Sequence, residues 1–295
     1  MRGGLDGEEN LQVLLHLVPG CRHCQEITAE LWWAGAGRRP RGSTAAADPG
    51  LSVDRVFDRV RRIHAGLEIE RAMARKVLAG LAGLPVASWG ARLAGEPPAW
   101  GLCELLLERS RDARAWDPQE AEGIACHAVA IAGEIPGENH PAGLLQDLTA
   151  RSWIAVAEAR RAGEDLAGAE EALRSAESHL ARGSGERLEK ARLMGVWAAL
   201  RCAQGRYREA GRLLRRALVV YRRTGQADLL GRTFLQLGYV HACAGDLTGA
   251  ALALRQGLVL ADAARDRETA VAAVYILSCL NPALNPGRRV RRVWR

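Results

Sequence analysis

Apolar residues recur at helical spacing along most of the chain. From Ser52, an expected N-cap, they return every three or four positions as far as about Gly83, which predicts one long amphipathic helix. Two shorter apolar segments, 11–17 and 21–33, precede it. Aromatic residues make up only 5% of the chain, and the abundance of alanine and leucine favours helices over strands. The pattern therefore predicts an all-α protein.

Interruptions of the apolar pattern divide the chain into five expected segments. Residues 1–34 form a small helical unit, and residues 35–50, rich in glycine, proline and arginine, form a flexible linker. Residues 51–99 hold the long helix and a proline-containing connector. Residues 100–280 carry paired helices, and residues 281–295 form a basic, disordered tail.

Within residues 100–280 the apolar pattern repeats about every 40 residues, with Ala169, Ala210 and Ala250 at the same position of three copies. Each alanine has apolar residues 16 and 13 positions before it, a small residue 12 before it, a leucine four after it and a small residue seven after it. These positions hold Trp153, Met194 and Phe234; Val156, Trp197 and Leu237; Ala157, Ala198 and Gly238; Leu173, Leu214 and Leu254; and Ala176, Ala217 and Gly257. The small residues let paired helices approach closely, and the copies must stack because one copy cannot bury its apolar face alone.

This frame resembles the tetratricopeptide repeat. The resemblance covers about residues 100–280 and implies a superhelical stack of helical hairpins, whose first helices line a concave groove that binds a protein partner. The chain departs from that family in two respects. Its period is about 40 residues rather than 34, and Arg160, Arg201 and His241 stand where the family has a tyrosine.

The repeat frame places one arginine on the expected concave face of each clear copy. These residues, Arg151, Arg192 and Arg232, lie two positions before the first large apolar residue. Three guanidinium groups in line would favour an acidic peptide or a C-terminal carboxylate. Since the chain holds 39 arginines in 295 residues, chance alignment is the simpler of the two explanations.

The sequence His16-x4-Cys21-x2-Cys24 has the spacing of a metal site. Two cysteines separated by two residues can both face one ion, and a histidine upstream supplies a third tetrahedral ligand for zinc. The stretch is similar to the zinc-binding anti-sigma domain, which has H-x3-C-x2-C. That resemblance implies zinc held by His16, Cys21 and Cys24, and a sigma factor or another regulator as partner.

The fourth ligand of this zinc site stays open, and so does the role of the two cysteines if no metal binds. No upstream cysteine or histidine supplies a fourth ligand, so the remaining candidates are Asp6, Glu8, Glu9, His23 and water. Without metal, Cys21 and Cys24 would be two partly buried thiols beside a helix start, where the helix dipole lowers thiol pKa values. No βαβ pattern surrounds them, so a thioredoxin-like enzyme is not expected.

The charge pattern argues against nucleic acid as the main partner. The formal charge is +7, but five arginines lie within residues 288–295, which leaves the rest of the chain close to neutral. Weak nucleic-acid binding through this tail is one alternative function. The chain has 39 arginines and two lysines, which is typical of a high-GC bacterial genome.

The C-terminal segment matches only the first helix of another copy, with Val274 and Leu277 in frame, and Pro282 and Pro286 oppose the second helix. We expect a chain cut short or, as the alternative, an uncovered apolar face that pairs with another molecule. A weaker copy also aligns on Leu105 and Ala121. The sequence shows neither a signal peptide nor a spanning helix, and seven cysteines, an odd number, favour a reducing cytoplasm.

No nucleotide-binding, metalloprotease or nucleophile-elbow motif is present in the sequence. We therefore expect a non-catalytic adaptor without a small-molecule substrate. It would bind a protein in the concave groove and carry a zinc-binding, anti-sigma-like N-terminus with a role in transcription or signalling. The competing hypothesis is a plain repeat scaffold without metal.

Overall fold

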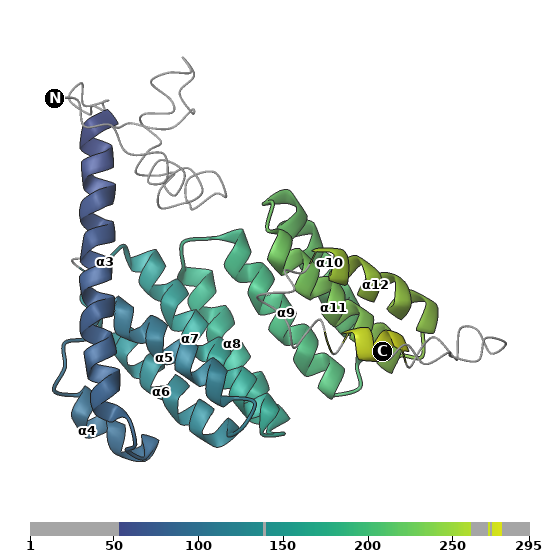
Figure 1. Cartoon of the computed structure of the whole chain (residues 1–295), viewed down its shortest axis with the longest axis horizontal. Helices are drawn as coiled ribbons and strands as arrows, with labels where there is room; N and C mark the ends of the chain where they lie inside the picture. The colour runs from purple at the N-terminus through teal and green to yellow at the C-terminus, as the bar shows by residue number, and fades with distance from the viewer. Residues whose placement is uncertain (1–52, 138–139, 261–270, 272, 279–295) are drawn as a thin grey trace, which may run out of the picture. The chain divides into compact units, whose positions relative to one another are not determined.

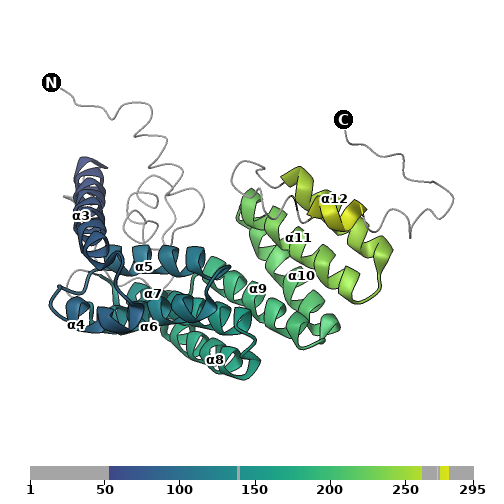
Figure 2. The same cartoon turned by 60° about the horizontal axis from the view of Figure 1, so that its bottom comes forward.

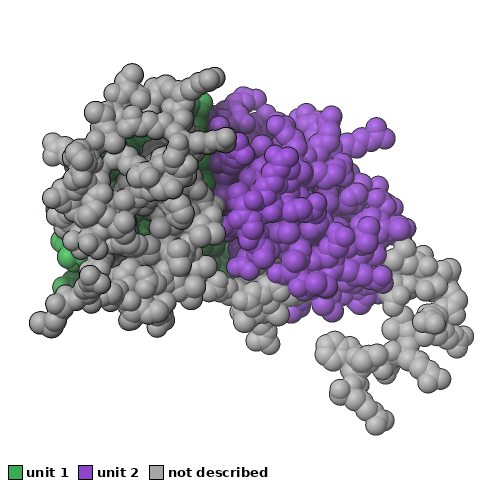
Figure 3. All heavy atoms as spheres, turned by 90° about the horizontal axis from the view of Figure 1, so that it is seen from above, with its two compact units in different colours: residues 1–156, 178–186 green, residues 157–177, 187–295 purple. Residues whose placement is uncertain are grey.

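The computed structural model describes residues 53–137, 140–260, 271 and 273–278, with side chains described from residue 65 onward. All regular secondary structure in these ranges is helical, which confirms the predicted all-α class. The chain falls into two compact units, one of residues 1–156 and 178–186 and the other of residues 157–177 and 187–295 (Figure 3).

The first unit is built around a long helix and one helical hairpin. Its elements are α3 (Val53–Leu81), η1 (Val86–Ser88), α4 (Trp89–Leu93), α5 (Trp100–Ala113) and α6 (Pro118–Glu134). α5 packs against α6 and against α3 (Figure 1). A Cβ at Gly101 would lie only 2.9 Å from the backbone nitrogen of Arg71, so glycine is what lets α5 approach α3 closely. The core of this unit includes Leu81, Leu106 and Ile124.

α7 (Ala142–Ala162) and α8 (Leu166–Arg182) contribute to both units. In the first unit, the buried carboxylate of Asp147 on α7 accepts hydrogen bonds from the hydroxyl and the backbone N–H of Ser184. Beside it, Nδ1 of His179 on α8 lies 2.8 Å from the side-chain oxygen of Gln146. These contacts join the start of α7 to the end of α8 and to the segment that follows it.

The second unit contains the C-terminal end of α7, the N-terminal part of α8 and the turn between them, all within residues 157–177. Two complete hairpins follow. These are α9 (Arg187–Ala203) with α10 (Tyr207–Arg223), and α11 (Ala227–Cys243) with α12 (Leu247–Leu260). α10 packs against both α9 and α11, and α11 packs against α12, as Figures 1 and 2 show. A further helical segment over residues 273–278 follows. The expected stack of tetratricopeptide-like helical hairpins is therefore confirmed.

Burial follows the repeat frame that the sequence predicted. Ala169, Ala210 and Ala250 are fully buried. A Cβ at Gly238 would lie 2.5 Å from Cγ of Leu254, and a Cβ at Gly257 would lie 2.5 Å from Cδ2 of Leu235. Small residues at these positions thus permit close helix packing, as predicted.

The first helices of the three hairpins between α7 and α12 end in the same way. Glu164, Gly205 and Gly245 occupy one position of the frame and have φ values of 66°, 74° and 81°. The residue after each donates its backbone N–H to a carbonyl five positions earlier, on Arg160, Arg201 and His241, over 2.9, 2.8 and 2.9 Å. This left-handed helix end reverses the chain between paired helices.

An aspartate starts the second helix in two of the three hairpins between α7 and α12. Asp165 accepts a hydrogen bond from the N–H of Gly168 over 2.9 Å, and Asp246 accepts one from Gly249 over 2.8 Å. The bond from Gly249 holds the pKa of the Asp246 carboxyl below its usual range. These are N-cap bonds, so the turn sequence both ends one helix and begins the next.

The segment over residues 273–278 carries the frame into a further copy. Ala273, Ile276 and Leu277 pack on α11 and α12. Val274 stands where Phe234 stands in the preceding copy, but it is 56% exposed, whereas Phe234 is 9% exposed.

Several predicted features lie outside the described residues. They are the N-terminal unit with His16, Cys21 and Cys24, the linker 35–50 and the tail 281–295. Among the described helices, none combines the length and apolar character needed to cross a membrane.

Candidate functional site

Two grooves in the second unit are candidate binding sites. We call the first the inner groove, because its walls come mainly from first helices of the hairpins. It has a volume of about 540 Å³. Its lining residues are Arg161, Ala198, Ala199, Cys202, Ala203, Tyr207, Leu214, Leu235, Gln236, Tyr239, Val240, Cys243, Leu254, Ala273 and Ile276.

Most walls of the inner groove are apolar, and its polar groups are mostly neutral. Burial raises the pKa of the Cys202 thiol to about 11, and Cys243 lies beside it within hydrogen-bonding reach. The hydrogen bond with Cys243 also raises the pKa of Tyr239. Cys202 and Tyr239 are therefore uncharged at neutral pH and act as hydrogen-bonding groups, which suits binding rather than thiolate chemistry.

Arg161, at the end of α7, brings a positive charge to the inner groove. Its Nε is buried and has no hydrogen-bond partner in the described part of the chain. A buried N–H donor without a partner is costly, and an acceptor on a bound molecule would satisfy it.

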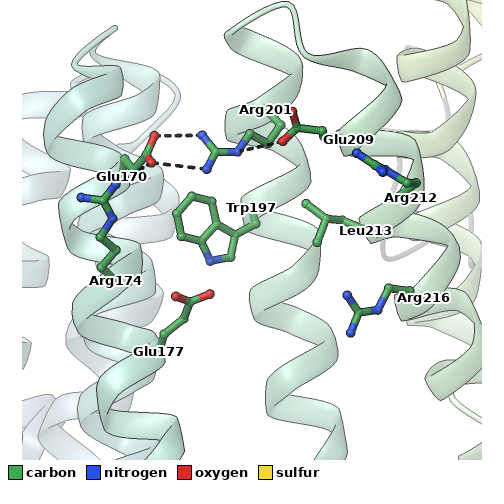
Figure 4. Close-up of a pocket in the computed structure, with 9 residues that line it drawn as sticks. All are labelled: Glu170, Arg174, Glu177, Trp197, Arg201, Glu209, Arg212, Leu213 and Arg216. Atoms are coloured by element: carbon green, nitrogen blue, oxygen red, sulfur yellow. Dashed lines mark hydrogen bonds and ion pairs between the residues drawn. The ribbon is translucent and has the colours of Figure 1, made fainter.

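The second site, which we call the outer groove, lies between α8 and α10 with α9 between them (Figure 4). It has a volume of about 550 Å³. Its lining residues are Glu170, Arg174, Glu177, Trp197, Arg201, Glu209, Arg212, Leu213 and Arg216.

An ion-pair network occupies one end of the outer groove. Both terminal nitrogens of Arg201 donate to the Glu170 carboxylate, over 2.8 and 3.3 Å. Arg174 donates to Glu170 over 2.9 Å, and Nε of Arg201 lies 3.7 Å from a Glu209 oxygen. The bonds from Arg201 and then Gln204 lower the pKa of Glu170 to about 2.

Trp197 forms the floor beside this network. The guanidinium carbon of Arg201 lies 4.7 Å from its ring centroid, a cation–π contact. The Trp197 side chain is 9% exposed, and its indole N–H has no hydrogen-bond partner among the described residues. In Figure 4 the indole nitrogen lies on the side of the ring toward Glu177.

Arg160, Arg201 and His241, which stand where tetratricopeptide repeats have a tyrosine, form contacts at the hairpin turns. Arg160 donates to the carbonyl of Gly168 over 3.1 Å, and Nδ1 of His241 lies 2.7 Å from the Asp246 carboxylate. Arg201 reaches Glu209 at the start of α10. Each of the three ties the end of a first helix to the start of the second helix in its own hairpin.

The three predicted partner-binding arginines line neither groove. Arg192 is exposed and pairs with Glu189, three residues earlier on α9, over 2.9 Å. Arg232 is also exposed, whereas Arg151 is half-buried and belongs to the first unit. Their alignment into one acidic-peptide site stays a prediction.

The sequence predicted no binding role for the groups that line the two grooves. Cys202 and Cys243 fall in adjacent copies at nearly the same frame position, a signal that could have paired them. The arginine-rich stretch 206–223 was visible too, but only the fold shows which of its arginines face Trp197. Within the described residues, no group of three or more His, Cys, Asp or Glu side chains is placed to hold a metal ion.

No protein-family model and no curated protein matches the chain. Distantly similar solved structures include one from Podosopora anserina and one from P. vanneervenii. One, from Podosopora anserina, is described as a kinesin light chain with nearly identical TPR-like repeats; it is 19% identical with a TM-score of 0.46, over 65% of this chain and 90% of that chain. The other, BtubC (BKLC) from P. vanneervenii, is 16% identical with a TM-score of 0.42, over 80% of this chain and 96% of that chain.

Proposed function

We propose that the protein is a non-catalytic adaptor that binds a segment of a partner protein in the inner groove. The observation that carries this proposal is the groove itself, whose walls come from successive first helices and are mainly apolar. A bound segment would place apolar side chains against the half-buried Ala199 and Ile276 and an acceptor on Nε of Arg161. Such a combination of apolar walls with a few directed polar groups is typical of peptide-binding grooves.

A substitution that fills the inner groove with a large side chain tests this function. Ala203 lines the inner groove and is exposed, so Ala203→Trp occupies the space with little cost to the fold. Ala227, exposed at the start of α11 and outside both grooves, provides the matched control Ala227→Trp. Peptides selected from a random display library on the full chain are then titrated against both variants.

Loss of peptide binding in Ala203→Trp, with binding retained in Ala227→Trp, is the expected result. Selected peptides should also lose affinity for Arg161→Gln. Peptides that bind all three variants equally would contradict the proposal, and so would a selection that yields no binder.

We further propose a regulatory role through the N-terminal unit, with zinc held by His16, Cys21 and Cys24 and a sigma factor or similar regulator as partner. The ligand spacing supports this proposal. Metal analysis of the purified chain should find zinc that Cys21→Ser removes. A zinc content near zero in both proteins would favour the plain scaffold instead.

The cytoplasm is the compartment we propose for this activity. Cys103, Cys126, Cys202 and Cys243 form no disulfide with one another in the described part of the chain, which supports a reducing environment. Mass spectrometry of the chain isolated with its thiols trapped should find these four cysteines reduced.

A further inference from the structure

α10 carries an unusual concentration of positive charge. Its 17 residues include six arginines and a single acidic residue, Glu209. Glu209 is already engaged by Arg206 over 2.7 Å and lies 3.7 Å from Arg201. The basic charge of this helix is therefore not neutralised from within the helix.

Two of these arginines belong to the outer groove. Arg212 and Arg216 lie one turn apart on α10 and extend toward α9 in Figure 4. Both are exposed, and neither makes an ion pair or a side-chain hydrogen bond with any described residue. Arg174 and Arg201 in the same groove both pair with Glu170. Among the lining arginines, Arg212 and Arg216 are therefore the ones without an ion pair to a described residue.

The indole N–H of Trp197 is a second, independent sign of a ligand. Its side chain is nine-tenths buried in the floor of the groove, and its donor has no partner in the described part of the chain. Buried donors without acceptors are rare because each costs free energy. One acceptor atom held between α8 and α10 would satisfy it.

The charges of the groove also select among anions. Glu177 lines the same groove, is exposed and makes no described ion pair. A continuous phosphate backbone would bring a negative charge close to Glu177 at every nucleotide. A protein segment can instead place single carboxylates beside Arg212, Arg216 and Trp197 and leave Glu177 facing a neutral residue.

We propose that the outer groove binds an acidic segment of a partner protein, with carboxylates paired to Arg212 and Arg216 and an acceptor on the indole N–H of Trp197. Leu213 supplies the apolar surface between the two arginines. This site is separate from the inner groove, and its test does not depend on the function proposed above.

The probe is a fluorescein-labelled peptide in which Asp and Glu alternate with Gly and Ser, titrated by fluorescence anisotropy against the full chain. The double variant Arg212→Glu/Arg216→Glu should weaken binding by roughly tenfold or more, because two charge-assisted pairs are lost. The matched control Arg222→Glu/Arg223→Glu makes the same change of charge on α10, outside the groove. It should lose much less affinity, and circular dichroism checks that both variants remain folded.

Two further measurements separate a built site from general attraction between charges. Glu177→Gln should strengthen peptide binding severalfold, since it removes the repelling carboxylate. The indole N–H resonance of Trp197, assigned through Trp197→Phe, should move downfield on addition of the peptide as it gains an acceptor.

Equal losses of peptide affinity in the two double variants would overturn the proposal. An indole N–H resonance of Trp197 that does not move at saturation would also overturn it, and so would the absence of peptide binding. A single-stranded oligonucleotide of equal charge is the competing probe. Tighter binding of that oligonucleotide, lost through the same Arg212 and Arg216 variant, would assign the groove to nucleic acid instead.

Discussion

Arg201 and Glu170 join two successive hairpins through a pair of hydrogen bonds of 2.8 and 3.3 Å (Figure 4). Glu170 belongs to α8, the second helix of one hairpin, and Arg201 to α9, the first helix of the next. Arg201 is only 13% exposed and also covers the ring of Trp197. The pair therefore fixes both the stacking of hairpins and the floor of the outer groove.

Loss of this pair should lower stability in a pH-dependent way. The pKa of Glu170 is lowered to about 2 in the folded chain, against about 4.3 for an ordinary glutamate in the unfolded chain. A carboxyl group whose pKa is lower in the folded chain than in the unfolded chain stabilises the fold. This contribution is fully present above the pKa of the unfolded chain and is lost as the pH falls from about 4.3 toward 2. Glu170→Gln should reduce the free energy of unfolding by about 1 kcal/mol near pH 7.

Urea unfolding of Glu170→Gln and the unchanged chain at a series of pH values checks this. The difference between the two should shrink below about pH 4.3. Glu171→Gln is the control, because Glu171 is an exposed neighbour whose carboxylate makes no described ion pair. A difference that is constant across the acid range would contradict the assigned role of Glu170.

Glu164→Gly should stabilise the protein. Glu164 has a φ of 66° at the helix end where the other two copies have Gly205 and Gly245. A side chain in this left-handed region is strained, whereas glycine adopts it freely. We expect a gain of about 0.5–1 kcal/mol in thermal or urea unfolding.

The reciprocal change Gly205→Ala places the same strain in the next hairpin. It should destabilise the fold by about 1 kcal/mol. No described atom lies within 4 Å of a Cβ at Gly205, so the loss would report backbone conformation alone. A stabilised Gly205→Ala would show that this turn does not require glycine.

Gly238→Ala should destabilise the hairpin of α11 and α12. The new methyl group would lie 2.5 Å from Cγ of Leu254 and 3.1 Å from the backbone nitrogen of Leu254. Overpacking of this kind costs about 1–3 kcal/mol. Gly133→Ala in α6 is the matched control, since its Cβ would meet nothing within 4 Å, and the better helix propensity of alanine should then stabilise α6.

Thiol reactivity should follow burial among the four described cysteines. Cys103 is fully buried, and burial raises its pKa to about 12, so it should resist iodoacetamide until the chain unfolds. Cys126 and Cys243 are exposed and should react first. Cys202, whose pKa is raised to about 11, should follow slowly because little thiolate is present.

Peptide mass spectrometry after timed alkylation gives the order of reaction. Rapid labelling of Cys103 in the native protein would contradict the packing of α5 against α6. Labelling of Cys202 as fast as Cys243 would contradict the greater burial of Cys202.

Local features of the sequence were sufficient to predict the helices, the hairpin frame and the close-packed positions. Helical periodicity depends on neighbours three and four residues apart, and a small residue such as Ala198 or Gly238 indicates close approach wherever its partner lies. The positive φ of Glu164 follows from its alignment with Gly205 and Gly245, although glutamate itself rarely adopts it.

Only the tertiary structure decided which side chains share a groove. The role of Arg192 in a partner-binding row stays a prediction; in the fold Arg192 pairs with Glu189 and lines neither groove. Arg212 and Arg216 gained their candidate role because stacking brings α10 beside Trp197 on α9. Such contacts depend on the angle and spacing at which helices pack, and these are set by side chains distant in the sequence.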